Sequence, residues 1–109
     1  MKEQKEREIK KDIADYLRLR KFLVINHRNV GIKKENGSYI PLPSGEKGVS
    51  DLLCCSPGGT FWAIEVKREA GKLTADQVEF LERVRKNKGV GMVAYDLGEV
   101  MQEVEKYYD

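Results

Sequence analysis

Apolar residues recur along this chain at two spacings, and the spacing of about 3.6 residues predicts three helices. They are expected over residues 3–20, 75–87 and 98–107. The side chains expected on their buried faces are Ile9, Ile13, Tyr16 and Leu17 in the first helix and Val78, Leu81 and Val84 in the second. The other positions of the first helix are mostly Lys, Glu, Arg and Asp, so we expect its outer face to be solvated.

Shorter apolar or alternating runs predict strands over residues 22–28, 49–55, 60–67 and 90–95. Asn36-Gly37 predicts a hairpin between Ile32 and Tyr39, because both central residues of such a turn need positive φ. Residues 41–48 are rich in Pro and Gly and predict a loop near the candidate site. The resulting order, α-β-β-β-α-β-α, favours an α/β fold with a mixed β-sheet flanked by helices.

The composition limits the classes of protein to which this chain can belong. The 109 residues fit a single domain, and a content of 40% hydrophobic and 35% charged residues is typical of a soluble globular chain. The net charge is only +2, so attraction to nucleic acid would have to come from local clusters of Lys and Arg. No apolar run approaches a membrane span, and we expect a cytosolic protein with no membrane partner. The adjacent Cys54 and Cys55 point to opposite strand faces, which favours reduced thiols.

Three polar residues interrupt the apolar runs of two consecutive predicted strands: Asp51, Glu65 and Lys67. Glu65 and Lys67 share one face of their strand, opposite to the core face that contains Trp62. Asp51 joins them only if it lies opposite Glu65, which requires a five-residue hairpin loop over residues 56–60. A loop one residue shorter would turn Asp51 to the wrong face. The sequence therefore predicts a specific register.

Two carboxylates in this arrangement suit a hard divalent cation such as Mg²⁺ or Mn²⁺, and the backbone carbonyl of Val66 is a candidate third ligand. Such an ion stabilises charge on a phosphate and lowers the pKa of water. Lys67 would position the water or neutralise developing charge; its use as a base would require a pKa lowered by burial. The competing interpretation is a solvated strand end with a cross-strand ion pair, since Glu-x-Lys alone is common.

The residues Gly48-Val49-Ser50-Asp51 and Glu65-Val66-Lys67, an N-terminal helix with a glutamate and a later helix with Gln77 resemble the PD-(D/E)xK nuclease superfamily. Within it, the chain looks most like stand-alone VRR-NUC proteins, with archaeal-type Holliday junction resolvases as near relatives. The resemblance covers nearly the whole chain. It implies a restriction-endonuclease-like fold, Asp51 and Glu65 as metal ligands, Lys67 as the catalytic lysine and Gln77 as a supporting residue.

Two of the resembling positions have rival explanations. Glu6 lies closer to the apolar helical stripe than Glu3 or Glu8, and it matches the family's Glu-x-x-Ile start, so we favour it as the helix acid, reaching the metal through water. All three acids would also favour a helix N-terminus through its dipole. Thr74 and Gln77 form a capping box, which by itself accounts for Gln77. Both roles are compatible only if the Gln77 amide reaches past the cap.

Basic residues near the predicted site are candidates for contacts with a nucleic-acid backbone. They are Arg28, Lys33, Lys34, Lys47, Arg68 and Lys72. Each is equally well explained as an ordinary solubilising residue. His27, the only histidine, is a weaker candidate for a phosphate contact. Tyr39 could stack on a base, whereas Trp62 is expected in the core.

Together these features predict a metal-dependent endonuclease that hydrolyses DNA, with Mg²⁺ or Mn²⁺ as cofactor. The resemblance implies branched DNA such as Holliday junctions, a homodimer, and a bacterial, archaeal or phage-encoded setting with a role in DNA repair. RNA remains an open substrate. The alternatives are a non-catalytic DNA-binding module of the same fold, a nuclease subunit that needs a partner, and a restriction-type enzyme, for which the chain offers little room.

Overall fold

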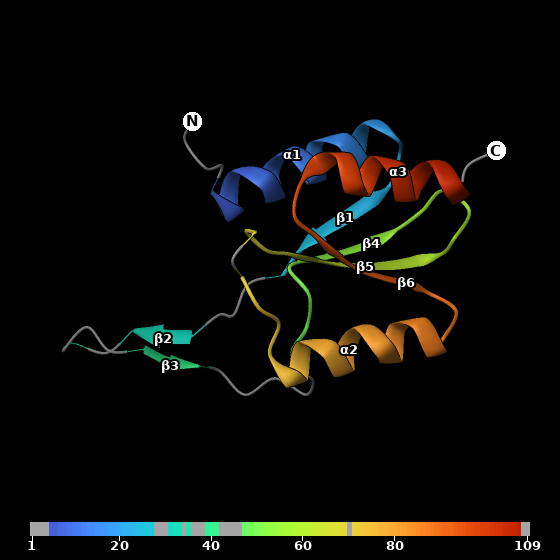
Figure 1. Ribbon diagram of the computed structural model, residues 1–109. Coiled ribbons are helices and arrows are strands. Elements are labelled where there is room, and N and C mark those ends of the chain that lie inside the picture. Colours follow the sequence, from blue (N-terminus) through green and yellow to red (C-terminus); the bar gives the residue numbers. More distant parts are fainter. Residues whose placement is uncertain are drawn as a thin grey trace.

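The computed structural model describes residues 5–27, 31–33, 35, 39–41, 47–69 and 71–107. Three helices and six strands follow one another through these residues (Figure 1). In chain order they are α1 (Glu6–Leu19), β1 (Leu23–Asn26), β2 (Gly31–Lys33), β3 (Tyr39–Pro41), β4 (Leu52–Cys55), β5 (Phe61–Val66), α2 (Ala75–Lys86), β6 (Val90–Ala94) and α3 (Leu97–Tyr107).

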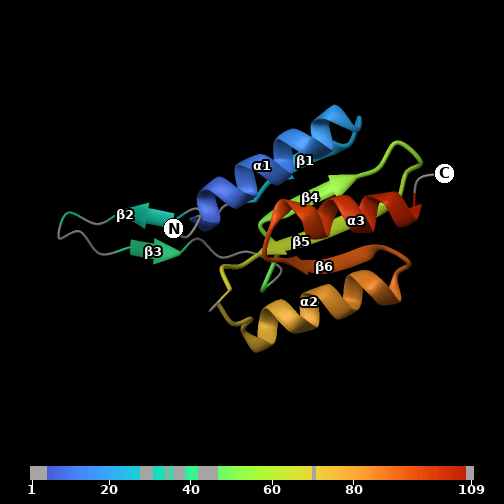
Figure 2. The ribbon, with the colours of Figure 1, turned by 45° about the horizontal axis from the view of Figure 1, so that its top comes forward.

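Four of the strands form one mixed sheet in the order β1-β4-β5-β6. Strand β4 is antiparallel to both β1 and β5, and β6 runs parallel to β5 because helix α2 carries the chain back across the sheet. Helices α1 and α3 lie on one face and α2 on the other (Figures 1 and 2). The main sheet and its helices therefore have the predicted α-β-β-β-α-β-α order.

The two faces of the sheet bury separate clusters of apolar side chains. The larger cluster joins α1 and α3 to β4 and β5 and includes Ile13, Leu17, Trp62 and Ile64, each at most 1% exposed. The smaller cluster, beneath α2, contains Ala63, Leu81 and Val84. Helix α2 approaches β6 closely at Gly91, where an added Cβ would lie 2.7 Å from the Leu81 carbonyl oxygen.

Several element predictions need adjustment. Val78 is 40% exposed, so its predicted place on the buried face of the second helix is wrong. The strand predicted over residues 49–55 begins only at Leu52. Strands β2 and β3 pair antiparallel, as predicted, but Ile32 lies opposite Ile40, whereas a two-residue turn at Asn36-Gly37 would place it opposite Pro41. Asn36-Gly37 and most of the loop at 41–48 lie outside the described residues.

Both cysteines are free, as predicted; Cys54 is buried and Cys55 half-buried. Burial raises the pKa of the Cys54 thiol to about 12, which makes it unreactive. Within the residues that the structure describes, no helix is long and apolar enough to cross a membrane.

Candidate active site

The hairpin between β4 and β5 sets the position of Asp51. Cys55 pairs with Phe61 and Leu52 with Ile64, which confirms the predicted register and its five-residue loop. Continuing the same ladder by one residue places Asp51 opposite Glu65. Residues opposite one another in an antiparallel pair have Cβ atoms about 5 Å apart. Two carboxylates from different strands are therefore brought together at the end of this hairpin.

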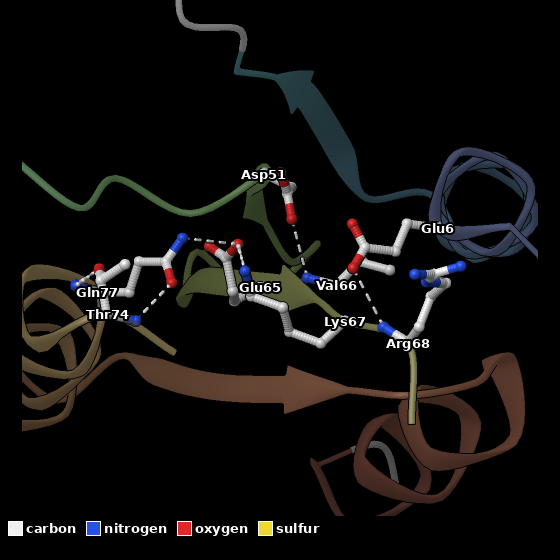
Figure 3. A network of polar contacts seen from close by, with 8 residues as sticks. All are labelled: Glu6, Asp51, Glu65, Val66, Lys67, Arg68, Thr74 and Gln77. Carbon is white, nitrogen blue, oxygen red and sulfur yellow. Dashed lines mark hydrogen bonds and ion pairs between the residues drawn. The ribbon is translucent and has the colours of Figure 1, made fainter. Parts of the chain in front are cut away.

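Backbone hydrogen bonds hold Asp51 in place on both sides. Its Oδ2 accepts a hydrogen bond from the Val66 N–H at 2.9 Å (Figure 3). Its own carbonyl accepts one from the His27 N–H at 2.8 Å. Because the N–H and C=O of a strand residue point to the same side, the Val66 carbonyl also faces the side of Asp51. The Lys67 N–H points the other way, to the Ala94 carbonyl of β6 at 3.0 Å.

Glu65 is a buried carboxylate, with only 3% of its surface exposed. Its Oε1 accepts a hydrogen bond from Gln77 Nε2 at 3.2 Å and lies 3.9 Å from Lys67 Nζ. Within the described part of the chain, its Oε2 has no hydrogen-bond partner. Burial, reinforced by the neighbouring Asp51 carboxylate and opposed by Lys67, raises the pKa of Glu65 to about 8. A cation placed between the two carboxylates would remove this electrostatic cost.

Gln77 serves the helix cap and contacts Glu65 at the same time. Its Oε1 accepts a hydrogen bond from the Thr74 N–H at 2.9 Å, while the Gln77 N–H donates to Thr74 Oγ1 at 3.2 Å, which completes the predicted capping box. Only the amide oxygen is needed for the cap, so the amide nitrogen is available to donate to Glu65 (Figure 3). The amide thus does reach past the cap.

Lys67 projects beside Glu65 but does not form a short ion pair with it. Its side chain is 17% exposed, and 3.9 Å between Nζ and Oε1 exceeds hydrogen-bond length. The backbone of Gly71 packs on the stem of this lysine, because an added Cβ there would lie 3.3 Å from Lys67 Cβ and Cδ. The ammonium is therefore confined at the site with donors left for another acceptor.

A groove of about 350 Å³ opens in front of Asp51. Its lining residues are Glu6, Arg7, Lys10, Asp51 and Val66. Glu6 projects from the first turn of α1, and its Oε1 accepts a hydrogen bond from the Arg68 N–H at 3.2 Å (Figure 3). Of the three candidate acids, Glu6 lines this groove, Glu8 is exposed outside its lining, and Glu3 lies outside the described residues.

Only three of the six predicted basic residues have side chains that the structure describes. Lys47, Arg68 and Lys72 are exposed, whereas Arg28 and Lys34 and the side chain of Lys33 lie outside the description. Sequence analysis missed Arg7 and Lys10, which line the groove beside Asp51. Acids and bases alternate along the first helix, so the sequence predicts a solvated position for both residues. The orientation of α1 on the sheet turns these two side chains toward the groove, and the sequence pattern does not predict that orientation.

Gly48 is a further site residue whose role the sequence left unexplained. Its φ is +70°, and an added Cβ would clash with the backbone of Asp76 at the start of α2. The segment that leads into Asp51 can therefore lie directly against the helix that carries Gln77.

Searches with family models and against curated proteins gave no match. A solved structure described as a "VRR_NUC domain" is 27% identical, with a TM-score of 0.67 over 94% of this chain and 97% of that one. The fold is that of a VRR-NUC domain. This likeness confirms the resemblance to VRR-NUC proteins and the restriction-endonuclease-like, PD-(D/E)xK nuclease fold. The VRR-NUC-like chain is thus a nuclease-like domain.

Proposed function

We propose that this chain is a divalent-metal-dependent endonuclease that hydrolyses DNA phosphodiester bonds. The observation that carries the proposal is the convergence of Asp51, Glu65 and Lys67 at one end of the β4–β5 hairpin. This cluster lies in a fold shared with a VRR-NUC domain. The alternative of a solvated strand end is disfavoured, because Glu65 is buried and one of its oxygens has no partner in the described residues.

The donor groups fit Mg²⁺ or Mn²⁺. In the described part of the chain no three His, Cys, Asp or Glu side chains gather as a metal site, so the protein would offer two carboxylates, Asp51 and Glu65, and the Val66 carbonyl. A small set of oxygen ligands is what Mg²⁺ uses when it also keeps waters and substrate oxygens. The ion, when bound, supplies positive charge to the phosphate and makes water more acidic.

The side chains around the two carboxylates have separate tasks in this proposal. Lys67 donates to the attacking water or to a phosphate oxygen, Gln77 holds the Glu65 carboxylate in its rotamer, and Glu6 holds water at the open side of the groove. The water oxygen forms a bond to phosphorus and loses one proton to solvent, the bond from phosphorus to one sugar oxygen breaks, and that oxygen takes up a proton from solvent. Exposed Lys47, Arg68 and Lys72 would meet neighbouring phosphates.

We further propose that the substrate is branched DNA, such as a Holliday junction, and that the enzyme acts as a homodimer in DNA repair. Two symmetric cuts need two sites related by a two-fold axis. Exposed apolar side chains on β1 and β5 support a second protein copy: Leu23, Ile25 and Phe61 are 64%, 53% and 43% exposed. Leu23, Cys55 and Phe61 form one row across three strands.

Asp51→Asn tests the proposal directly. With Mg²⁺ or Mn²⁺, the wild-type protein should cut at least one member of a panel of linear, flapped and four-way DNA, and EDTA should abolish cutting. The variant keeps an oxygen to accept from Val66, so it should fold and bind DNA but cut more than about 100-fold more slowly. Calorimetry should show weaker metal binding. Glu82→Gln, which removes an exposed carboxylate on α2, should change neither property.

Each other outcome has a defined meaning. Undiminished cutting by Asp51→Asn would remove this residue from the mechanism. Tight DNA binding by the wild-type protein with neither cutting nor metal binding would favour the non-catalytic module, or a subunit that needs a partner. Matched RNA substrates would show whether the activity is confined to DNA.

A further inference from the structure

A second groove, of about 220 Å³, lies next to the candidate active site along the flank of α1. Its lining residues are Arg7, Lys10, Lys11, Ala14, Arg18 and Asn26. It shares Arg7 and Lys10 with the groove in front of Asp51, so the two grooves are adjacent. Four of its six lining residues are cationic and none is acidic, whereas the active-site end carries two carboxylates.

The four cations follow the geometry of the helix. Lys10, Lys11 and Arg18 lie three, four and eleven residues after Arg7, with the small Ala14 at seven, and these positions share one flank of α1. Eleven residues of α-helix span about 16 Å, the axial length of roughly five nucleotides of one duplex strand. The opposite wall is Asn26 of β1, and the next residue, His27, donates its N–H to the Asp51 carbonyl. The groove thus lies between α1 and the end of β1, beside the acidic site, and follows α1 away from it.

Acidic neighbours do not cancel this charge. Asp15 pairs with Lys11 at 2.8 Å, and this hydrogen bond raises the pKa of Lys11, which keeps the lysine protonated. Asp15 is also influenced by the charge of Arg18, and the charge of Asp12 also acts on Lys11, but neither acid lines the groove. If Asp15 neutralises one of the four positive charges, the groove still has a net positive charge, because no carboxylate lines it.

We propose that this groove holds the phosphodiester backbone of the DNA strand on one side of the bond that is cut. The inference rests on the proposed nuclease function and deepens it. Lys11 and Arg18 are positioning residues, since they contact the strand away from the reacting phosphate. Arg7 and Lys10 lie where the strand enters the active site, and the Asn26 amide can donate to a phosphate or sugar oxygen.

The test is a double variant, Lys11→Gln with Arg18→Gln, which leaves the lining of the active-site groove unaltered. The matched control, Lys86→Gln with Lys88→Gln, removes the same charge from exposed positions at the end of α2. DNA binding is measured at several salt concentrations in EDTA, with protein that also carries Asp51→Asn, so that no cutting occurs. Each lost phosphate contact should reduce the slope of log K against log salt by about 0.9, and affinity near 100 mM salt should fall about tenfold.

Cleavage by the same double variant without Asp51→Asn separates positioning from chemistry. KM should rise while kcat at saturating DNA stays within about twofold. The rise in KM should disappear when the DNA on one side of the cut is shortened so that it no longer reaches the groove. It should persist when the DNA on the other side is shortened. A salt slope identical to that of the control, or a defect that survives both trims, would overturn the inference. If wild-type protein binds through this groove but cuts nothing, the proposed activity fails while the groove still contacts DNA.

Discussion

Strand β5 presents Trp62, Ile64 and Val66 to the cluster beneath α1 and α3, and Ala63 and Glu65 to the side covered by α2. The first face is apolar along its whole length, and all three side chains are at most 2% exposed. The second face is apolar at Ala63 and then changes within one strand repeat to a buried carboxylate. One strand therefore belongs to a continuous core on one side and to a charged site on the other.

The contrast shows how a small domain can support a buried charge. Burying Glu65 beside Asp51 costs free energy, since an ionised carboxylate loses its hydration. The opposite face of the same strand gains free energy from complete burial of large apolar side chains, at roughly 25 cal/mol per Å². The apolar face thus fixes the backbone on which the two carboxylates are held together.

The largest expected effect comes from removing the main side chain of the apolar face. Trp62 makes edge-to-face contacts with Phe22 and Tyr107, with ring centroids 5.4 and 5.6 Å apart. Trp62→Ala should lower the free energy of unfolding by about 3–5 kcal/mol, measured by urea denaturation. Phe61→Ala, which removes an aromatic ring that is 43% exposed, is the control and should cost less than half as much. If both substitutions lowered the free energy of unfolding equally, the two faces of β5 would contribute equally to stability.

Glu65 should have a smaller effect on the free energy of unfolding, and this effect should depend on pH. Its pKa in the fold, about 8, is above its ordinary value of 4.5, so between these values the metal-free native state binds more protons than the unfolded chain. The free energy of unfolding should therefore decrease as pH rises from about 5 to 8, by on the order of a few kcal/mol. Glu65→Gln should remove most of this slope, as followed by urea titrations in EDTA.

Two further measurements sharpen that test. Glu82→Gln, at an exposed position of α2, should leave the slope as it is in the wild-type protein. Saturating Mg²⁺ should raise the stability of the wild-type protein at pH 8, because the ion binds the folded state, but should have little effect on Glu65→Gln. A flat wild-type profile in EDTA would show that the buried carboxylate carries no electrostatic cost.

Much of the site was predictable because it follows from strand geometry. The period of two and the five-residue hairpin loop fix the register of β4 and β5, and extending it by one residue beyond Leu52 places Asp51 opposite Glu65. The helical stripe likewise placed Glu6 next to the buried residues of α1. These relations are local in sequence, or connected by one short turn.

What the sequence did not reveal depends on how helices dock on the sheet. Val78 continues the apolar pattern of α2, yet this first-turn residue is left exposed. The positive φ of Gly48 and its close approach to the backbone of Asp76 are likewise not encoded by a local pattern. Arg7 and Lys10 alternate with acids, and only the orientation of α1 turns them into the groove.

The smallest expected effects separate the two roles of Gln77. Gln77→Glu keeps a carboxyl oxygen for the capping box but replaces the amide that donates to Glu65 with a third carboxylate. Repulsion from Glu65 and Asp51 should lower stability by on the order of 1 kcal/mol, while kcat/KM falls about tenfold. Thr74→Ala removes the hydroxyl of the cap and leaves the Gln77 amide, so it should cost about 1 kcal/mol of stability with kcat/KM within about twofold. The pair needs only urea denaturation and initial-rate measurements. If both variants changed stability and activity in the same proportion, Gln77 would support the site only by holding the first turn of α2, and its contact with Glu65 would have no separate role.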